Sequence, residues 1–216
     1  MTLDGIRETR ARLGDRIHHT PLLSSATRAA GEASGARLAD GQLYLKAEHL
    51  QKTGSFKPRA ALSRIESLTP DERRRGAITI SAGNAGQAYA WAGREAGVPV
   101  TVVMPAAAVE SKVAACREYG AEVVLHGTHV GESLERLEEL RVERGLTLVH
   151  PYDQPEVLLG NGSCGLEILE GVRETRARLG DRIPHTPLLA SATAARVAAE
   201  AAGVRIADGL LYHACT

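Results

Sequence analysis

The sequence contains few aromatic residues and few lysines. Its 216 residues include one Trp, one Phe and five Tyr, and only four of its 26 basic residues are lysine. The acidic residues also number 26, so the formal net charge is zero. Balanced charge argues against a protein that binds nucleic acid by neutralising phosphates and against one that binds membranes through a basic face. We therefore expect neither a nucleic-acid partner nor a membrane partner.

Long hydrophobic runs and paired cysteines are also absent. No run approaches the roughly 18 consecutive apolar residues that cross a bilayer, and Met1–Asp4 does not resemble a signal peptide. The cysteines Cys116, Cys164 and Cys215 lie far apart and lack Cys-x-x-Cys spacing. One His-x-x-His pair has no third ligand nearby, so we expect no metal site. These features predict a cytoplasmic protein with reduced, non-functional cysteines.

The lysines are clustered. Lys46, Lys52 and Lys57 fall within twelve residues, and the only phenylalanine, Phe56, directly precedes Lys57. The chain uses arginine for nearly all other positive charge, yet only an amine can form a Schiff base. The cluster therefore indicates a reactive lysine, and a chance grouping on a solvated surface is an equally weighted alternative.

The sequence contains one long repeat. The segment Gly5–Glu48 returns as Gly171–Thr216, and the two copies are nearly identical as far as Thr193. Two such similar copies indicate a recent duplication rather than a solenoid. Where the first copy has Leu45–Glu48, the second has His213–Thr216.

Strand and helix patterns alternate between the two copies. β-Branched runs predict strands at Ala77–Ser81, Val100–Met104, Glu122–Leu125 and Thr147–Val149. Apolar periodicity closed by glycine predicts helices at Ala85–Ala96, Val109–Tyr119 and Ser133–Arg144. The alternation predicts an α/β fold, an open parallel sheet with helices on both faces. Ligands bind at the carboxyl ends of such strands, so we expect the site in the loops after Ile80, Met104 and Val149.

The loop Thr53–Pro58 follows a further predicted strand at 43–46. A glycine permits a tight turn, Ser55 is the expected N-cap, and Lys57 falls in the first turn of a helix that runs to about Leu68. A cation at a helix N-terminus is disfavoured by up to about 1 kcal/mol, which favours the neutral, nucleophilic amine. The alternative is an ordinary capped helix with a surface lysine.

The loop Ser81–Gln87 lies at the carboxyl end of a predicted central strand. Its small residues let backbone N–H groups approach an anion such as a carboxylate, and Asn84 offers both a donor and an acceptor. The loop is neither Gly-x-Gly-x-x-Gly nor a P-loop, so its pattern alone indicates only a general anion site.

These loops resemble the pyridoxal 5′-phosphate (PLP) site of the threonine dehydratase and serine racemase family, which has the tryptophan-synthase-β-like fold. Lys46–Arg59 resembles the family's PLP-lysine motif, and Ser81–Ala88 is similar to its substrate-carboxylate loop. His150–Ile168 resembles the segment that follows the small domain, and Ile17–Leu22 the N-terminal segment. The resemblance covers about Gly5–Gly171.

The resemblance implies PLP-dependent lyase chemistry. Lys57 would bind PLP covalently and act as the base at the substrate α-carbon, Phe56 would pack beside the cofactor ring, and Asn84 would hydrogen-bond its phenolic oxygen. The substrate carboxylate would be held by Ser81, Gly83, Asn84 and Gln87. Loss of the β-hydroxyl from threonine or serine would then give a 2-oxo acid and ammonia.

The chain departs from the family pattern at several positions. Ala82 replaces the serine base of the racemases, which favours dehydration over racemisation. Ala85 replaces a usual histidine and Ala60 a usual glycine. The family binds the cofactor phosphate with a run of glycines, but this sequence has no two adjacent glycines. The alternatives are therefore an ammonia-lyase of weak or lost activity and a non-catalytic, oligomerising remnant; a serine racemase-like enzyme is disfavoured.

The resemblance also predicts a domain organisation with an incomplete large domain. Its four parts are the N-terminal segment of the large domain (1–45), the PLP-lysine strand and helix with the small βαβ domain (46–150), a return segment (151–170) and the repeated N-terminal segment (171–216). Without the rest of the large domain, the apolar residues Ile6, Leu13, Val172 and Leu179 need another partner. We therefore expect a homo-oligomer or partial disorder.

Overall fold

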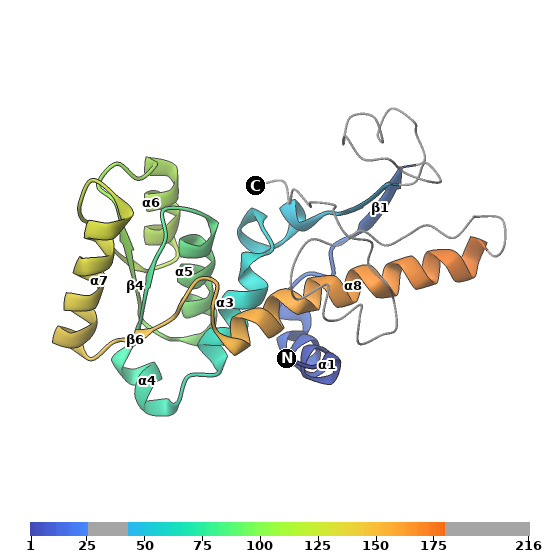
Figure 1. Cartoon of the computed structure of the whole chain (residues 1–216), viewed down its shortest axis with the longest axis horizontal. Coiled ribbons are helices and arrows are strands. Elements are labelled where there is room, and N and C mark those ends of the chain that lie inside the picture. Colours follow the sequence, from blue (N-terminus) through green and yellow to red (C-terminus); the bar gives the residue numbers. More distant parts are fainter. Residues whose placement is uncertain (26–42, 180–216) are drawn as a thin grey trace.

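A four-stranded parallel sheet forms the centre of the body in the computed structural model, which describes residues 1–25 and 43–179 (Figure 1). The strand order is β5-β4-β3-β6, with strands Ala77–Ile80 (β3), Val100–Met104 (β4), Glu122–Leu125 (β5) and Thr147–Leu148 (β6). All neighbouring strands are parallel, so the predicted α/β sheet is confirmed. The β4 and β5 bounds match their predicted ranges, whereas β3 and β6 each end one residue earlier.

Helices cover both faces of the sheet. The crossover helices are Asn84–Ala96 (α5), Glu110–Glu118 (α6) and Val130–Arg144 (α7). Val102 and Met104 are buried in the cluster that includes side chains of α5 and α6. Ile78 and Val103 are buried in a separate cluster with Leu137 of α7. Because successive strand residues face opposite sides, one strand supplies both cores.

The strand order gives the sheet a topological switch point. The chain steps from β3 to β4 and then β5, and after α7 it returns to place β6 on the other side of β3. The connections therefore diverge between β3 and β6. Ligands in open α/β sheets bind at such a switch point, outside the carboxyl ends of the strands.

The N-terminal part adds a two-stranded antiparallel sheet and several short helices. Its elements are Leu3–Leu13 (α1), Gly14–Arg16 (η1), Leu22–Ser25 (β1), Leu43–Lys46 (β2), Glu48–Leu50 (η2), Lys52–Gly54 (η3), Lys57–Glu66 (α3) and Pro70–Arg75 (α4). In the β1–β2 pair, Leu22 lies opposite Lys46. Helix α3, which was expected to reach about Leu68, ends slightly earlier, at Glu66.

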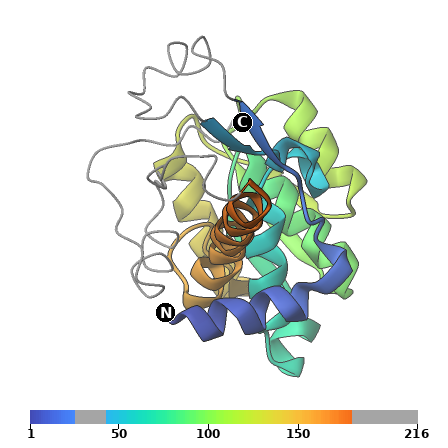
Figure 2. The same cartoon turned by 90° about the vertical axis from the view of Figure 1, so that its right-hand side faces the viewer.

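The longest helix, Pro155–Leu179 (α8), projects from the body and packs on α3 and α1 (Figures 1 and 2). At Gly160 an added Cβ would lie 2.4 Å from the carbonyl oxygen of Arg59, so glycine allows the two helix backbones to approach closely. The helix continues past Gly171, where the sequence repeat begins. The repeated segment is thus helical at 171–179, like its first copy in α1, and the rest of the second copy lies outside the described residues.

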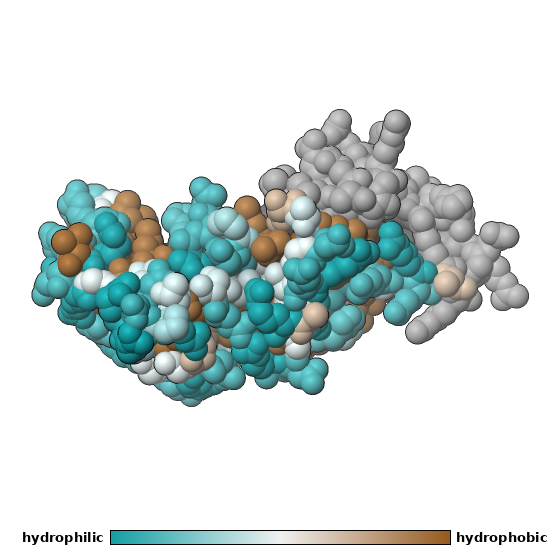
Figure 3. All heavy atoms as spheres, turned by 90° about the horizontal axis from the view of Figure 1, so that it is seen from below, coloured by the Kyte–Doolittle hydropathy of each residue, from teal (hydrophilic) through white to brown (hydrophobic). Residues whose placement is uncertain are grey.

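Three of the four apolar residues expected to need another partner are buried within the chain itself. Ile6 and Leu13 are fully buried, and Val172 is 9% exposed. Ile6 packs on Leu166 and Leu169 of α8, so α1 and α8 cover each other's apolar faces. Figure 3 shows hydrophilic residues over most of the face viewed from below. The side chain of Leu179 lies outside the described residues, and no helix among those described is long and apolar enough to cross a bilayer.

Candidate active site

The loop before α3 presents Lys57 at the start of a helix. Thr53 has φ 59° and Gly54 has φ 70°, which turns the chain before α3. The N-cap position is held by Phe56, whose φ of −70° is helical, and not by Ser55 as predicted. Because the preceding 3-10 turn leaves Ser55 extended, its hydroxyl does not cap the first turn of α3.

The Lys57 amine lies near two aromatic rings. Its Nζ is 4.9 Å from the ring centroid of Phe56 and 4.6 Å from that of Tyr152. Partial burial lowers the pKa of Lys57, so more of the amine is neutral than in an exposed lysine. Tyr152 follows β6, and its proximity places Lys57 at the switch point of the sheet. The sequence singled out the loop after Val149 but not Tyr152.

The other clustered lysines have different surroundings. The side chain of Lys46 is 4% exposed and forms an ion pair with Glu167, with 2.6 Å between Nζ and Oε2. Lys52 lies in the 3-10 turn η3. Within the described residues, only Lys57 of the three approaches aromatic rings.

The second predicted loop connects β3 to α5. Gly83 donates its N–H to Ser81 Oγ at 3.1 Å, and an added Cβ on Gly83 would meet no atom within 4 Å. Asn84 begins α5, and its Oδ1 accepts a hydrogen bond from Lys112 Nζ at 2.8 Å. Gln87 Oε1 accepts from the same ammonium at 3.3 Å. The loop therefore has open space beside Gly83 and two amides held by one cation.

The two loops meet through packing of helices. Helix α5, which begins at Asn84, packs on α3, which begins at Lys57, and also on the turn Lys52–Gly54. The two predicted loops thus lead into helices that pack on each other. Lys112 was not among them, although it is the one lysine outside the cluster and could have been found for that reason.

A buried ionic network surrounds Arg59, two residues after Lys57 in α3. The guanidinium of Arg59 is fully buried and bonds both oxygens of Glu48, at 2.8 and 2.9 Å, and both oxygens of Glu167, at 2.9 and 2.8 Å. Arg10 also donates to Glu167, at 2.6 Å. Burial opposes ionisation of Glu167, but the hydrogen bonds and charges of Arg59 and Lys46 outweigh it and lower the pKa of Glu167 to about 2.

The lowered pKa of Glu167 predicts a pH-dependent stability. Because the folded carboxyl titrates near 2 and the ordinary value is 4.5, its stabilising effect is complete above about 4.5 and is lost as pH falls toward 2. Glu167→Gln should flatten the acid side of the stability profile measured by urea unfolding. The control Glu139→Gln removes a carboxylate that is 63% exposed and should leave that limb unchanged. Identical acid limbs for wild type and Glu167→Gln would contradict the prediction.

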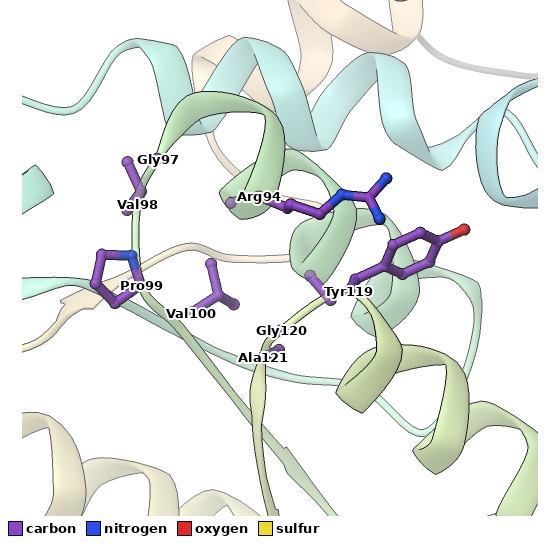
Figure 4. A pocket seen from close by; sticks show the side chains of 10 residues that line it. Arg94, Gly97, Val98, Pro99, Val100, Tyr119, Gly120 and Ala121 are labelled. Atoms are coloured by element: carbon purple, nitrogen blue, oxygen red, sulfur yellow. The ribbon is translucent and has the colours of Figure 1, made fainter.

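The remaining hollow, the possible metal ligands and the cysteines add nothing to the two loops. A hollow of about 290 Å³ borders the C-terminal end of α5 and the start of β4, where Arg94 stacks over Tyr119 (Figure 4). Its lining on α5 begins at Ala90, six residues or about 9 Å along the helix axis from Asn84. Within residues 1–25 and 43–179, no three His, Cys, Asp or Glu side chains could hold a metal. Burial raises the pKa of Cys116 to about 11 and that of Cys164 to about 12, and Cys215 lies outside the described residues.

Comparisons with known proteins agree with this geometry. Residues 15–205 match the family described as pyridoxal-phosphate dependent enzyme. The chain is 41% identical over 170 residues to an L-threonine ammonia-lyase of Thermotoga maritima, covering 79% of this chain and 41% of that protein. It is 38% identical over 172 residues to a catabolic L-threonine dehydratase of Staphylococcus aureus, covering 80% and 48% respectively. The chain therefore spans less than half the length of these curated relatives.

Solved structures show the same fold. A threonine deaminase from T.th. has a TM-score of 0.69 and 39% identity, covering 83% of this chain and 53% of that one. A serine racemase from Dictyostelium discoideum has a TM-score of 0.70 and 36% identity, covering 79% and 53%. With the family match across most of its length, a parallel sheet of this topology and a lysine at the switch point, the chain belongs to the pyridoxal-phosphate dependent enzyme family.

Proposed function

We propose that this chain carries the PLP-binding lysine, Lys57, of an ammonia-lyase that acts on threonine or serine. The observation that carries the proposal is the Lys57 amine, which lies near two aromatic rings at the switch point of the sheet. The names of the threonine ammonia-lyase and threonine dehydratase relatives support this substrate class. PLP, a cytoplasmic location and the four-part domain organisation belong to the same proposal.

The residues present fit the reactive end of PLP. The hydroxyls of Thr53 and Ser55 are buried and make no hydrogen bond within the described ranges, and Ser55 is only 4% exposed. Buried hydroxyls normally have partners, so a polar ligand beside this loop would satisfy them. The loop between β3 and α5 offers such a ligand open space beside Gly83 and the polar amides of Asn84 and Gln87.

Each residue then has a chemical role. When bound, PLP withdraws electrons from the substrate α-carbon. The Lys57 amine would attach the cofactor and take the α-proton, a role helped by its lowered pKa. Phe56 would pack beside the ring, and Asn84 would donate to the phenolic oxygen. Ser81, Gly83, Asn84 and Gln87 would hold the substrate carboxylate. Departure of the β-hydroxyl and hydrolysis release a 2-oxo acid and ammonia.

A serine racemase activity is the second candidate, because a solved serine racemase has the same fold. Ala82 argues against it. Its methyl side chain is exposed and has no group that could donate or accept a proton on the second face of the substrate. A non-catalytic chain is the third candidate, since the sequence has no adjacent glycines to bind the cofactor phosphate.

We also propose that the chain forms a homo-oligomer. Leu23 and Leu45 lie opposite each other on the β1–β2 pair and are 50% and 49% exposed. Paired exposed leucines are an apolar surface that a second copy would cover. Sedimentation of the purified chain tests this proposal, and a monomer at all concentrations would contradict it.

One set of assays separates the three activities. The purified chain is incubated with PLP, its visible absorption is recorded, and L-threonine or L-serine is added. We expect a visible band and release of 2-oxobutanoate from threonine or pyruvate from serine. Formation of D-serine without pyruvate would favour the racemase. Absence of both the band and any product would favour the non-catalytic chain.

A further inference from the structure

Among the described residues, Lys112 is the only lysine whose ammonium donates hydrogen bonds to the loop Ser81–Gln87. It lies on α6, and its Nζ donates to Asn84 Oδ1 at 2.8 Å and to Gln87 Oε1 at 3.3 Å. Both residues are shielded from solvent to some degree: Gln87 is only 9% exposed, and Asn84 is half-buried. A single cation on a neighbouring helix therefore contacts both amide side chains at the start of α5.

The chemistry of the ammonium fixes the direction of each amide. A lysine ammonium has three donors and no acceptor, whereas an amide has an acceptor oxygen on one side and two donors on the other. Each amide must turn its oxygen toward Lys112. The NH₂ groups of Asn84 and Gln87 then point away from Lys112, as donors only.

Donor groups are what the proposed ligand requires. The phenolic oxygen of PLP and the substrate carboxylate are both anionic acceptors, so an amide that presented its oxygen would repel them. Without Lys112, each amide could rotate and present either end. The positive charge of Lys112 also favours an anion nearby, since no acidic side chain bonds to it in the described part of the chain.

We propose that Lys112 is a positioning residue, which holds Asn84 and Gln87 by their oxygens so that both amides present N–H donors to the anionic groups of cofactor and substrate. This inference rests on the proposed function for its ligand. The orientation itself rests on the two hydrogen bonds from the Lys112 ammonium.

The orientation can be tested without PLP. In ¹⁵N-labelled protein free of PLP, the side-chain NH₂ resonances are assigned by their loss in Asn84→Asp and Gln87→Glu. Lys112→Met should shift both pairs of resonances. The control Arg117→Met removes an exposed cation from the same helix and should shift neither pair. Unmoved resonances in Lys112→Met would overturn the proposal.

The role in binding has its own readout. Loss of an ordered, charge-assisted donor set should weaken PLP binding by about tenfold or more in Lys112→Met. Lys112→Arg, which also only donates, should restore part of the affinity, whereas Lys112→Gln, which can donate or accept, should not. Wild-type affinity in Lys112→Met would overturn the positioning role. If no variant bound PLP while the resonances still shifted, the proposed function would fail and the amide orientation would stand.

Discussion

Replacing Lys57 by alanine is expected to abolish covalent attachment of PLP and to lower threonine turnover by about a thousandfold or more, because the change removes the group that forms the covalent bond. The variant should still fold, since the amine makes ring contacts and no ion pair in the described part of the chain. The measurement is borohydride reduction of the PLP-treated protein, followed by mass-spectrometric mapping of the modified lysine.

Two further variants separate chemistry from charge. Lys57→Arg keeps a cation beside Phe56 and Tyr152 but cannot form the covalent bond, so it should be as inactive as Lys57→Ala. Lys52→Ala removes the lysine of the preceding turn and should keep both the label and the activity. A label on Lys52, or activity that survives in Lys57→Arg, would contradict the assignment of Lys57.

The sheet and its crossover helices could be predicted because their patterns are local. Each strand is a short β-branched run, and α5 and α7 both end at glycines with φ near 65°, Gly97 and Gly145, a conformation that glycine adopts without strain. The loop Ser81–Gln87 could be located for the same reason, since it follows a strand whose direction in a parallel sheet is fixed.

The parts that were missed depend on contacts between distant residues. Arg59 meets Glu167 across more than a hundred positions of sequence, and no local pattern marks this pair. Tyr152 lies beside Lys57 only because β6 returns to the far side of β3. The partner of Ile6 is α8 of the same chain. The sequence did not show this because the docking of two helices is not encoded in the apolar pattern of either one.

The ionic network of Arg59, Glu48 and Glu167 gives the second large expected effect, which is on stability. Arg59→Leu should lower the free energy of unfolding by about 3–5 kcal/mol, because it leaves the carboxylates of Glu48 and Glu167 buried with too few donors. Lys46 and Arg10 still contact Glu167, whereas Glu48 is left with the hydrogen bond from the Thr20 hydroxyl. Urea unfolding at neutral pH measures the loss.

A matched control and a double variant define the cause. Arg74→Leu removes an arginine that is 71% exposed and should change the free energy of unfolding by less than about 1 kcal/mol. Arg59→Leu combined with Glu167→Gln should be less destabilised than the sum of the two single variants, since the second change removes a charge that the first left unpaired. Strict additivity would show that the two side chains do not interact.

The network also links folding to the site. Arg59 lies two residues after Lys57 in α3 and is bonded to Glu48, just after β2, and to Glu167 of α8. The turn after β2 and the distant helix α8 are thereby both bonded to the first turn of α3. In Arg59→Leu molecules that remain folded, the start of α3 loses this anchor, so PLP labelling of Lys57 should slow relative to Arg74→Leu. Equal labelling rates at equal folded fraction would show that α3 is held in place by its apolar contacts alone.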